Sequence, residues 1–165
     1  MSGLAETLKF DGSIRTLEAA APWRWQDAET LRNAGRLSAA AYLFGYVAEM
    51  RLTAACFHVL GYNEGQPIRR EQRKECEKEA RALQVMSDDP HDLRGWARYL
   101  VYLRKREMRG YNPEFRDTLI AHVDGLYDNW RPRLRYRALN PNAAQLNQIR
   151  SAAEWLNNCY TELWS

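Results

Sequence analysis

The sequence predicts an all-α fold, a helical bundle of five to six helices of up-and-down type around one long central apolar helix. Three observations support this prediction. Residues 35–62 are almost entirely apolar, no segment alternates apolar and polar residues as a half-buried strand does, and Gly, Pro and Asn residues divide the rest into helix-length segments. At 165 residues, the chain is expected to form one domain.

The N-terminal region, residues 1–22, is weakly patterned and is predicted to be a partly ordered arm before a single bundle at 23–165. A short helix is expected from Trp25 to Asn33. The central helix then follows Gly35 and ends near Leu60. Its two adjacent apolar stripes are rich in alanine, which indicates burial on most sides and close approach by neighbouring helices.

The remaining helices are delimited by sequence breaks. Residues 68–86 are strongly charged with a thin apolar seam, which indicates a solvated helix carrying pairs of opposite charge. Asp-Pro and Asn-Pro steps start further helices, because Asp and Asn cap helices and Pro fits the first turn. The expected helices are 91–109, 113–130 and one starting at Asn140-Pro141, with an irregular basic segment at 131–139.

Bulk properties exclude several classes of protein. A formal net charge of +3 permits a nucleic-acid partner without requiring one. Cys56, Cys76 and Cys159 are widely spaced, which argues against a disulfide framework or zinc site and favours a reducing, cytoplasmic location. No signal-peptide pattern is present, and charges at the centre of the apolar helix would cost about 2.5 to 3.5 kcal/mol each in a bilayer, so no membrane contact is expected.

Motifs of phosphate-binding loops, zinc proteases, serine hydrolases and calcium loops do not occur, so no metal and no cofactor are expected. The candidates for chemistry are therefore Arg, His and isolated carboxylates. The first candidate is the segment RDTLIAH, from Arg116 to His122. A His that moves protons at a 2′-hydroxyl and an Arg that holds the phosphate can cleave RNA without a metal.

Helix geometry restricts this pair. Six residues at about 100° each place the Arg116 and His122 side chains about 120° apart on a regular helix. They converge only if the first turn is distorted or if the pair works across a dimer. The structural alternative is a partly buried His122 bonded to the backbone, with Arg116 paired to Asp117 or to a nearby Glu.

The central helix supplies a second candidate, because Glu49 and Arg51 are the only charges between Arg36 and His58. Glu49 shares a face with Tyr46, and a buried carboxylate there must accept hydrogen bonds. The functional interpretation is a polar patch in a cleft that orients an Arg or a His, and the structural one is a buried polar network. Arg51 and His58 share another face and form a further Arg/His option.

Arginines and aromatic residues alternate between residues 98 and 137. Arginine can grip phosphates while aromatic rings stack on bases. The alternative is a set of surface arginines neutralised by the acids of the charged helix. The predicted nucleic-acid contacts are Arg98, Arg104, Lys105, Arg106, Arg109, Arg131, Arg135 and Tyr136.

The run AAAYLFGYVAEMRL in the central helix resembles the HEPN family of small helical bundles, whose helix carries an A-x-x-L-x-G-Y-x-x-E pattern. The resemblance extends to His91-Asp92-Leu93 and to Trp130 with Arg135-Tyr136. It implies a bundle that commonly dimerises. Many family members are metal-independent endoribonucleases of toxin–antitoxin, CRISPR or phage-defence systems, and others are inactive and bind nucleotides or partner proteins.

The family's catalytic motif is an Arg followed a few residues later by a His, and Arg116, Asp117 and His122 fit that spacing by count. The resemblance therefore implies a homodimer that handles RNA or nucleotides, with an antitoxin or another protein as a further partner. If it is an enzyme, it is a metal-independent endoribonuclease. The alternative is a non-catalytic interaction or dimerisation module, favoured by the large apolar arc of the central helix and by six tryptophans.

Overall fold

The structure, a computed structural model, describes residues 12–89, 91–109, 112–136 and 140–165, with the backbone alone at 135 and 136. The all-α bundle predicted from the sequence is confirmed for these residues, which contain no strand. The helices are α2 (Ile14–Asn33), α3 (Leu37–Val59), α4 (Arg70–Ala82), α5 (Leu93–Arg106), α6 (Pro113–Asn129), the 3-10 helix η1 (Pro132–Tyr136) and α7 (Ala143–Asn158).

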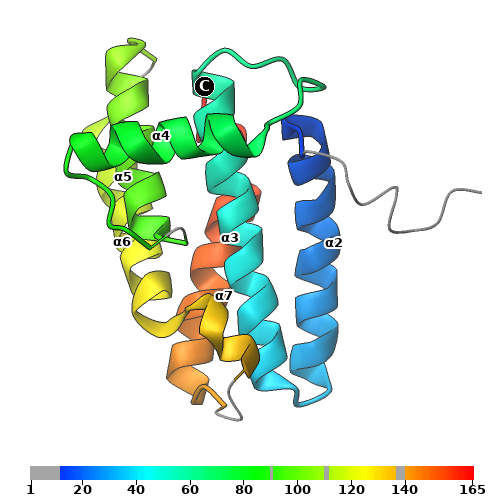
Figure 1. The fold of residues 1–165 in the computed structure, drawn as a ribbon. Coiled ribbons are helices and arrows are strands. Elements are labelled where there is room, and N and C mark those ends of the chain that lie inside the picture. The colour runs from blue at the N-terminus through cyan, green and yellow to red at the C-terminus, as the bar shows by residue number, and fades with distance from the viewer. Residues whose placement is uncertain (1–11, 90, 110–111, 137–139) are drawn as a thin grey trace, which may run out of the picture.

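Helix α3 forms the centre of the bundle (Figure 1). Helices α2, α5 and α7 pack around it, and α6 packs against α5 and α7. Helix α4 departs from the up-and-down arrangement, because it lies across the face of the bundle in front of α3 and α5 (Figure 1). The connection from α3 to α4 lies at one end of the bundle, and the connection from α4 to α5 runs back toward its middle, so residues distant in sequence come together under α4.

The burial of α3 follows from its two apolar stripes. Every residue from Val47 to Phe57 except Met50 is buried. Each large aliphatic or aromatic side chain buried in this way contributes about 1.5–3 kcal/mol. None of the described helices is both long and apolar enough to cross a membrane.

Helix α2 begins at Ile14, so the expected start at Trp25 is wrong and residues 14–22 are helical. The buried positions of α2 are Ile14, Ala21 and Ala28, which are seven residues apart. This stripe packs along α3. It is hard to recognise in the sequence because two of its three members are alanines, which contribute little to an amphipathic pattern.

Two local features allow α2 to start at Ile14, before the expected start at Trp25. The Ser13 hydroxyl accepts a hydrogen bond from the Thr16 amide at 3.2 Å, and the Thr16 hydroxyl accepts one from the Ser13 amide at 2.6 Å, which is a capping box. Pro22 lies on the exposed side of the helix, where water can satisfy the carbonyl that lacks an amide partner. Residues 1–11 of the predicted arm lie outside the described residues.

Trp130, which follows α6, anchors that end of the helix on α3. Its indole is buried, and Nε1 donates to the carbonyl oxygen of Tyr42 at 3.2 Å. The ring of Tyr46 meets it edge-on at a centroid distance of 6.3 Å. A Cβ atom at Gly45 would lie 2.1 Å from the indole, so only glycine permits this approach. The basic segment after Trp130, expected to be irregular, starts as the 3-10 helix η1.

Candidate functional site

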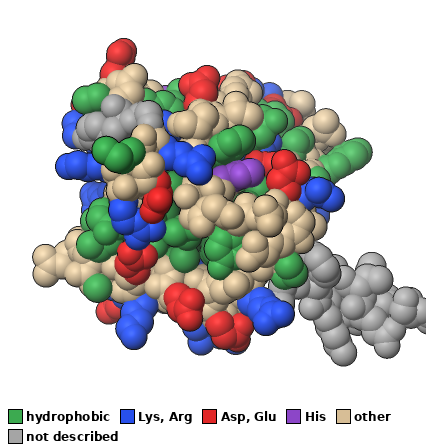
Figure 2. Space-filling model, turned by 90° about the horizontal axis from the view of Figure 1, so that it is seen from above, with side chains coloured by type: hydrophobic (Ala, Val, Ile, Leu, Met, Phe, Trp, Pro, Cys, Tyr) green, Lys and Arg blue, Asp and Glu red, His purple; other side chains and the backbone are tan. Residues whose placement is uncertain are grey.

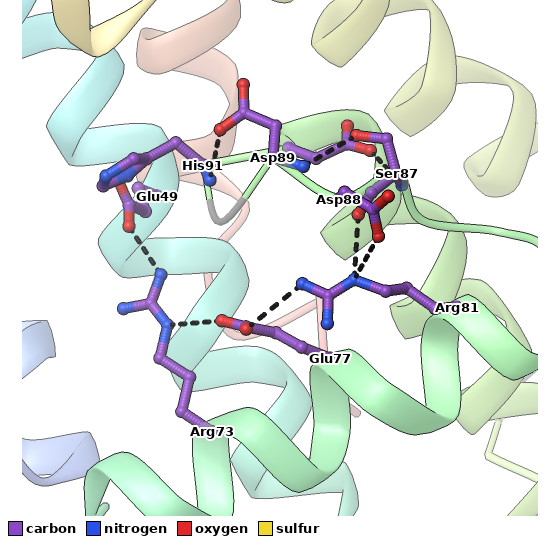
Figure 3. A network of polar contacts seen from close by, with 9 residues as sticks. Glu49, Arg73, Glu77, Arg81, Ser87, Asp88, Asp89 and His91 are labelled. Carbon is purple, nitrogen blue, oxygen red and sulfur yellow. Dashed lines mark hydrogen bonds and ion pairs between the residues drawn. The ribbon is translucent and has the colours of Figure 1, made fainter.

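The buried Glu49 carboxylate, near the middle of α3, is the centre of a polar site on the face of the bundle that α4 crosses. One oxygen accepts from Nη2 of Arg73, on α4, at 2.6 Å, and the other is 3.2 Å from Nδ1 of His91, in the connection before α5 (Figure 3). Burial alone would raise the pKa of Glu49. The hydrogen bond from His91 and the charge and hydrogen bond of Arg73 outweigh burial and hold this pKa below its usual value.

A chain of ion pairs fixes Arg73 from the other side. Its Nε lies 3.5 Å from Glu77, and Glu77 lies 3.5 Å from Nη2 of Arg81. Arg81 in turn reaches Asp88 at 3.5 Å and the carbonyl of Ser87 at 3.2 Å. The arginines of these pairs are partly exposed and their distances are long, so each pair is expected to stabilise by about 1 kcal/mol or less. Their effect here is to orient the Arg73 guanidinium toward Glu49 (Figure 3).

His91 is held by its backbone and by its ring. Its amide donates to Oδ1 of Asp89 at 2.9 Å, and the other oxygen of Asp89 accepts from the Tyr127 hydroxyl at 3.3 Å. Because a carboxylate only accepts, Nδ1 of His91 donates to Glu49, and Nε2 is the nitrogen left for a ligand. The hydrogen bond to Glu49 raises the pKa of His91 above its usual value, although partial burial opposes this.

Two hollows meet at His91. The larger has a volume of about 590 Å³ and the smaller about 210 Å³. With the side chain 34% exposed, His91 contributes to the wall of each. The larger hollow is lined by Asp89, His91, Arg131, Pro132 and Arg133. The smaller is lined by Arg70, Arg73, Lys74, Glu77 and His91.

Cations without carboxylate partners border both hollows. Arg131 donates through Nη1 to the carbonyl oxygens of Tyr127 and of Trp130, the latter at 2.6 Å, so neutral groups satisfy it and leave its charge uncancelled. Arg133, Arg70 and Lys74 are exposed and form no ion pair within the described ranges. Such cations at a concave surface are suited to bind phosphate or carboxylate groups.

Arg116 and His122 lie at different places on α6. Arg116 binds Asp117 with Nε and Nη2, each at 2.7 Å, and borders a crevice against α5. His122 stacks on Trp155 at a centroid distance of 4.8 Å and borders a hollow of about 330 Å³ between α6 and α7. Partial burial lowers the pKa of His122. Helix α6 is capped normally by Asn112, so its first turn does not bring the pair together within one chain.

The predicted nucleic-acid contacts are distributed over several surfaces. Arg104 is buried and donates to the carbonyl oxygens of Glu162, Leu163 and Ser165, so it supports the segment after α7 instead of facing solvent. Arg106 pairs with Glu79 at 2.9 Å and with its neighbour Glu107.

The remaining predicted nucleic-acid contacts do not share one surface. Arg98, Lys105 and Arg109 are exposed along α5 and its end, and Arg131 borders the larger hollow. The side chains of Arg135 and Tyr136 lie outside the described part of the chain. On the face seen from above, cationic and anionic side chains are interspersed and not separated by sign (Figure 2).

Arg51 and His58, the further Arg/His option, are both enclosed by other parts of the bundle. Arg51 donates to Oδ1 of Asn157 from Nε at 3.0 Å and from Nη2 at 2.7 Å, and its side chain is buried. Nε2 of His58 lies 3.0 Å from Glu18, and its ring stacks on Trp164 at 4.2 Å. These contacts give the pair a structural role in holding α2 and the end of the chain on α3.

Sequence reasoning placed a polar patch at Glu49 but did not identify Arg73 or His91 as its partners. The expected partner for this carboxylate was an Arg or a His, and the structure supplies one of each. Tyr46, expected to support the patch, packs its ring edge-on against Trp130. The sequence did contain one indication of this partner. His91 belongs to the segment His91-Asp92-Leu93 that resembles the HEPN family, but nothing in the sequence linked it to Glu49.

The donor atoms at this site favour an anionic ligand. Across the described residues, no group of three or more His, Cys, Asp or Glu side chains is arranged to hold a metal ion. The chain matches no protein-family model, no curated protein and no solved structure with which it was compared. Function is therefore inferred from the fold and from the chemistry around Glu49 and His91.

Proposed function

We propose that this protein handles RNA or nucleotides and binds their phosphate groups in the two hollows beside His91. The observation that supports this most directly is the position of His91, paired with the buried Glu49 and open to two hollows bordered by cations. Guanidinium and ammonium groups provide charge-assisted hydrogen bonds to phosphate oxygens, and the imidazole of His91 can add a further hydrogen bond through Nε2.

We further propose that the chain is HEPN-like, on the resemblance of its central helix. Gly45 and Trp130, two of the residues in that resemblance, contact one another. On this proposal the protein is a cytoplasmic homodimer of a toxin–antitoxin or phage-defence type system, with an antitoxin or another protein as a partner. If it is catalytic, it is a metal-independent endoribonuclease.

The catalytic version has two candidate histidines. His122 needs Arg116 from a second chain, because the two side chains border different hollows in one chain. His91 has its orienting carboxylate, Glu49, in the same chain. A His oriented in this way through Nδ1 can exchange a proton through Nε2.

Binding of a fluorescently labelled single-stranded RNA, measured by anisotropy at several salt concentrations, tests the proposal. We expect affinity that falls steeply with salt. Replacing Arg133 or Lys74 by Gln should weaken binding and reduce the slope of log K against log salt by about 0.7 each. Arg24→Gln, on the exposed face of α2, is the matched control. Absence of salt-dependent binding to both RNA and nucleotides would refute the proposal.

The second candidate function is a non-catalytic interaction module. It is supported by exposed apolar side chains, of which Trp23 is 68% exposed and Met108 92% exposed. Exposed aromatic residues of this size are frequent anchors of protein interfaces. Analytical ultracentrifugation of the wild type and of Trp23→Ser tests it: an oligomer that this substitution dissociates, together with no RNA binding, favours the interaction module.

A further inference from the structure

Among the described residues that line them, the two hollows share one side chain, His91, and their cations come from different elements. Arg131 and Arg133 stand at the end of α6 and on η1, whereas Arg70 and Lys74 stand on α4. Each hollow therefore has its own cationic wall. A single phosphate in either hollow would leave the cations of the other without an anion.

We propose that the ligand carries two phosphate groups separated by a sugar, as in a nucleoside 3′,5′-bisphosphate, with one phosphate in each hollow and His91 between them. This inference rests on the proposed function and specifies its ligand. The larger hollow binds one phosphate through Arg131 and Arg133, and the smaller binds the other through Arg70 and Lys74.

The position of His91 favours a ligand with two separated phosphates over one with two directly joined phosphates. Phosphates joined directly, as in a nucleoside diphosphate, share an oxygen and belong in one hollow. His91 lines both hollows, whereas the other described lining residues of the two differ, so two phosphates held at the two cationic walls must be linked by an intervening group that passes His91. The 3′ and 5′ phosphates of one nucleoside, the repeating unit of an RNA strand, are linked through the ribose.

The carboxylates that line the hollows, Asp89 and Glu77, do not neutralise the cations beside them. Asp89 accepts from the His91 amide and from the Tyr127 hydroxyl. Glu77 is 3.5 Å from both Arg73 and Arg81. Because donors already engage these acid groups, Arg133 on one side and Lys74 on the other keep their charge available for a ligand.

Isothermal titration calorimetry with adenosine 3′,5′-bisphosphate, 5′-AMP and ADP tests the inference. We expect the 3′,5′-bisphosphate to bind about tenfold more tightly than 5′-AMP, the factor expected for one additional charge-assisted phosphate contact. ADP should bind within a few-fold of 5′-AMP. Equal affinity for the 3′,5′-bisphosphate and 5′-AMP, or ADP binding as tightly as the 3′,5′-bisphosphate, would overturn the inference and leave the proposed function intact.

Two matched variants assign the phosphates to the hollows. Arg133→Gln and Lys74→Gln should each lower affinity for the 3′,5′-bisphosphate about tenfold, whereas only one of them should affect 5′-AMP. Both side chains are exposed, so the variants should keep the wild-type circular dichroism spectrum, as should the control Arg24→Gln. Equal losses of 5′-AMP binding in both variants would indicate that both side chains contact the same phosphate, which would overturn the inference. No binding of any of the three nucleotides would count against the proposed function as well.

Discussion

The indole of Trp130 occupies the space that a side chain at Gly45 would need. A Cβ atom there would lie 2.1 Å from both Cε2 and Nε1 of the ring. The indole is fully buried and bonded to the Tyr42 carbonyl, so it has no free space into which to move. This contact joins α3 to the segment that carries Arg131 and Arg133, and it thereby positions one wall of the larger hollow.

Gly45→Ala should therefore destabilise the protein by about 1–3 kcal/mol or more, the range for overpacking a close-packed core. For a chain of this length each kcal/mol lowers the melting temperature by about 2–4 °C. Thermal unfolding followed by circular dichroism measures the change. Gly125→Ala on α6 is the control, because nothing lies within 4 Å of the added Cβ. Equal melting temperatures for Gly45→Ala and the wild type would show that the Trp130 indole can shift to make room for the added methyl group.

Arg104→Met should also destabilise the protein, because the buried guanidinium donates to carbonyl oxygens of Glu162, Leu163 and Ser165. Of these bonds the one to Leu163 is buried, and leaving a buried acceptor without its donor costs about 1–3 kcal/mol. Urea unfolding measures the difference. The exposed Arg98→Met on the same helix should change stability by less than about 0.5 kcal/mol. Comparable losses in both variants would mean that the bonds to the carbonyls contribute little.

The sequence predicted those parts of the fold that leave a local pattern, such as an apolar stripe along a helix or a capping residue at its start. The apolar stripes of α3 made its central place evident, and Asn112-Pro113 marked the start of α6. The early part of α2 was missed because its buried stripe consists largely of alanine. A local pattern cannot reveal a helix whose main support is its packing against a neighbour.

The candidate site was predictable only in part, for a related reason. A carboxylate inside an apolar helix must be paired, so a polar network at Glu49 followed from its position. Its partners Arg73 and His91 lie 24 and 42 residues away in sequence. Their convergence depends on how α4 crosses the bundle, which no periodicity encodes. For Arg116 and His122, the sequence predicted separation on a regular helix and left convergence across a dimer open, and α6 is regular from its first turn.

The Glu49–His91 pair should make stability depend on pH. The pKa of His91 is raised, so its stabilisation is fully present below its unfolded value of about 6.5 and is lost as pH rises through the folded value. The pKa of Glu49 is lowered, so its stabilisation is present above about 4.5 and is lost as pH falls further. The pair therefore stabilises the fold most between about pH 4.5 and 6.5.

Glu49→Gln tests this assignment. The loss of unfolding free energy relative to the wild type should be larger at pH 5.5 than at pH 8.5, because a larger fraction of His91 is protonated at the lower pH. The same substitution should lower the pKa of His91, which NMR titration of the imidazole measures. Glu18→Gln, which removes the partner of His58, is the control that should leave the His91 titration unchanged. An unaltered His91 titration in Glu49→Gln would contradict the pairing.

Cleavage of single-stranded RNA in EDTA distinguishes the two candidate histidines. If Arg116 and His122 act together across a homodimer, Arg116→Ala and His122→Ala should each abolish cleavage. Mixing and reassociating the two variants should then restore part of it, because a mixed dimer contains one site with both side chains intact. His91→Ala should abolish cleavage without rescue by mixing if His91 is the proton-transfer group instead. Equal cleavage by the wild type and all three variants, or no cleavage by the wild type, would exclude a ribonuclease that uses either histidine.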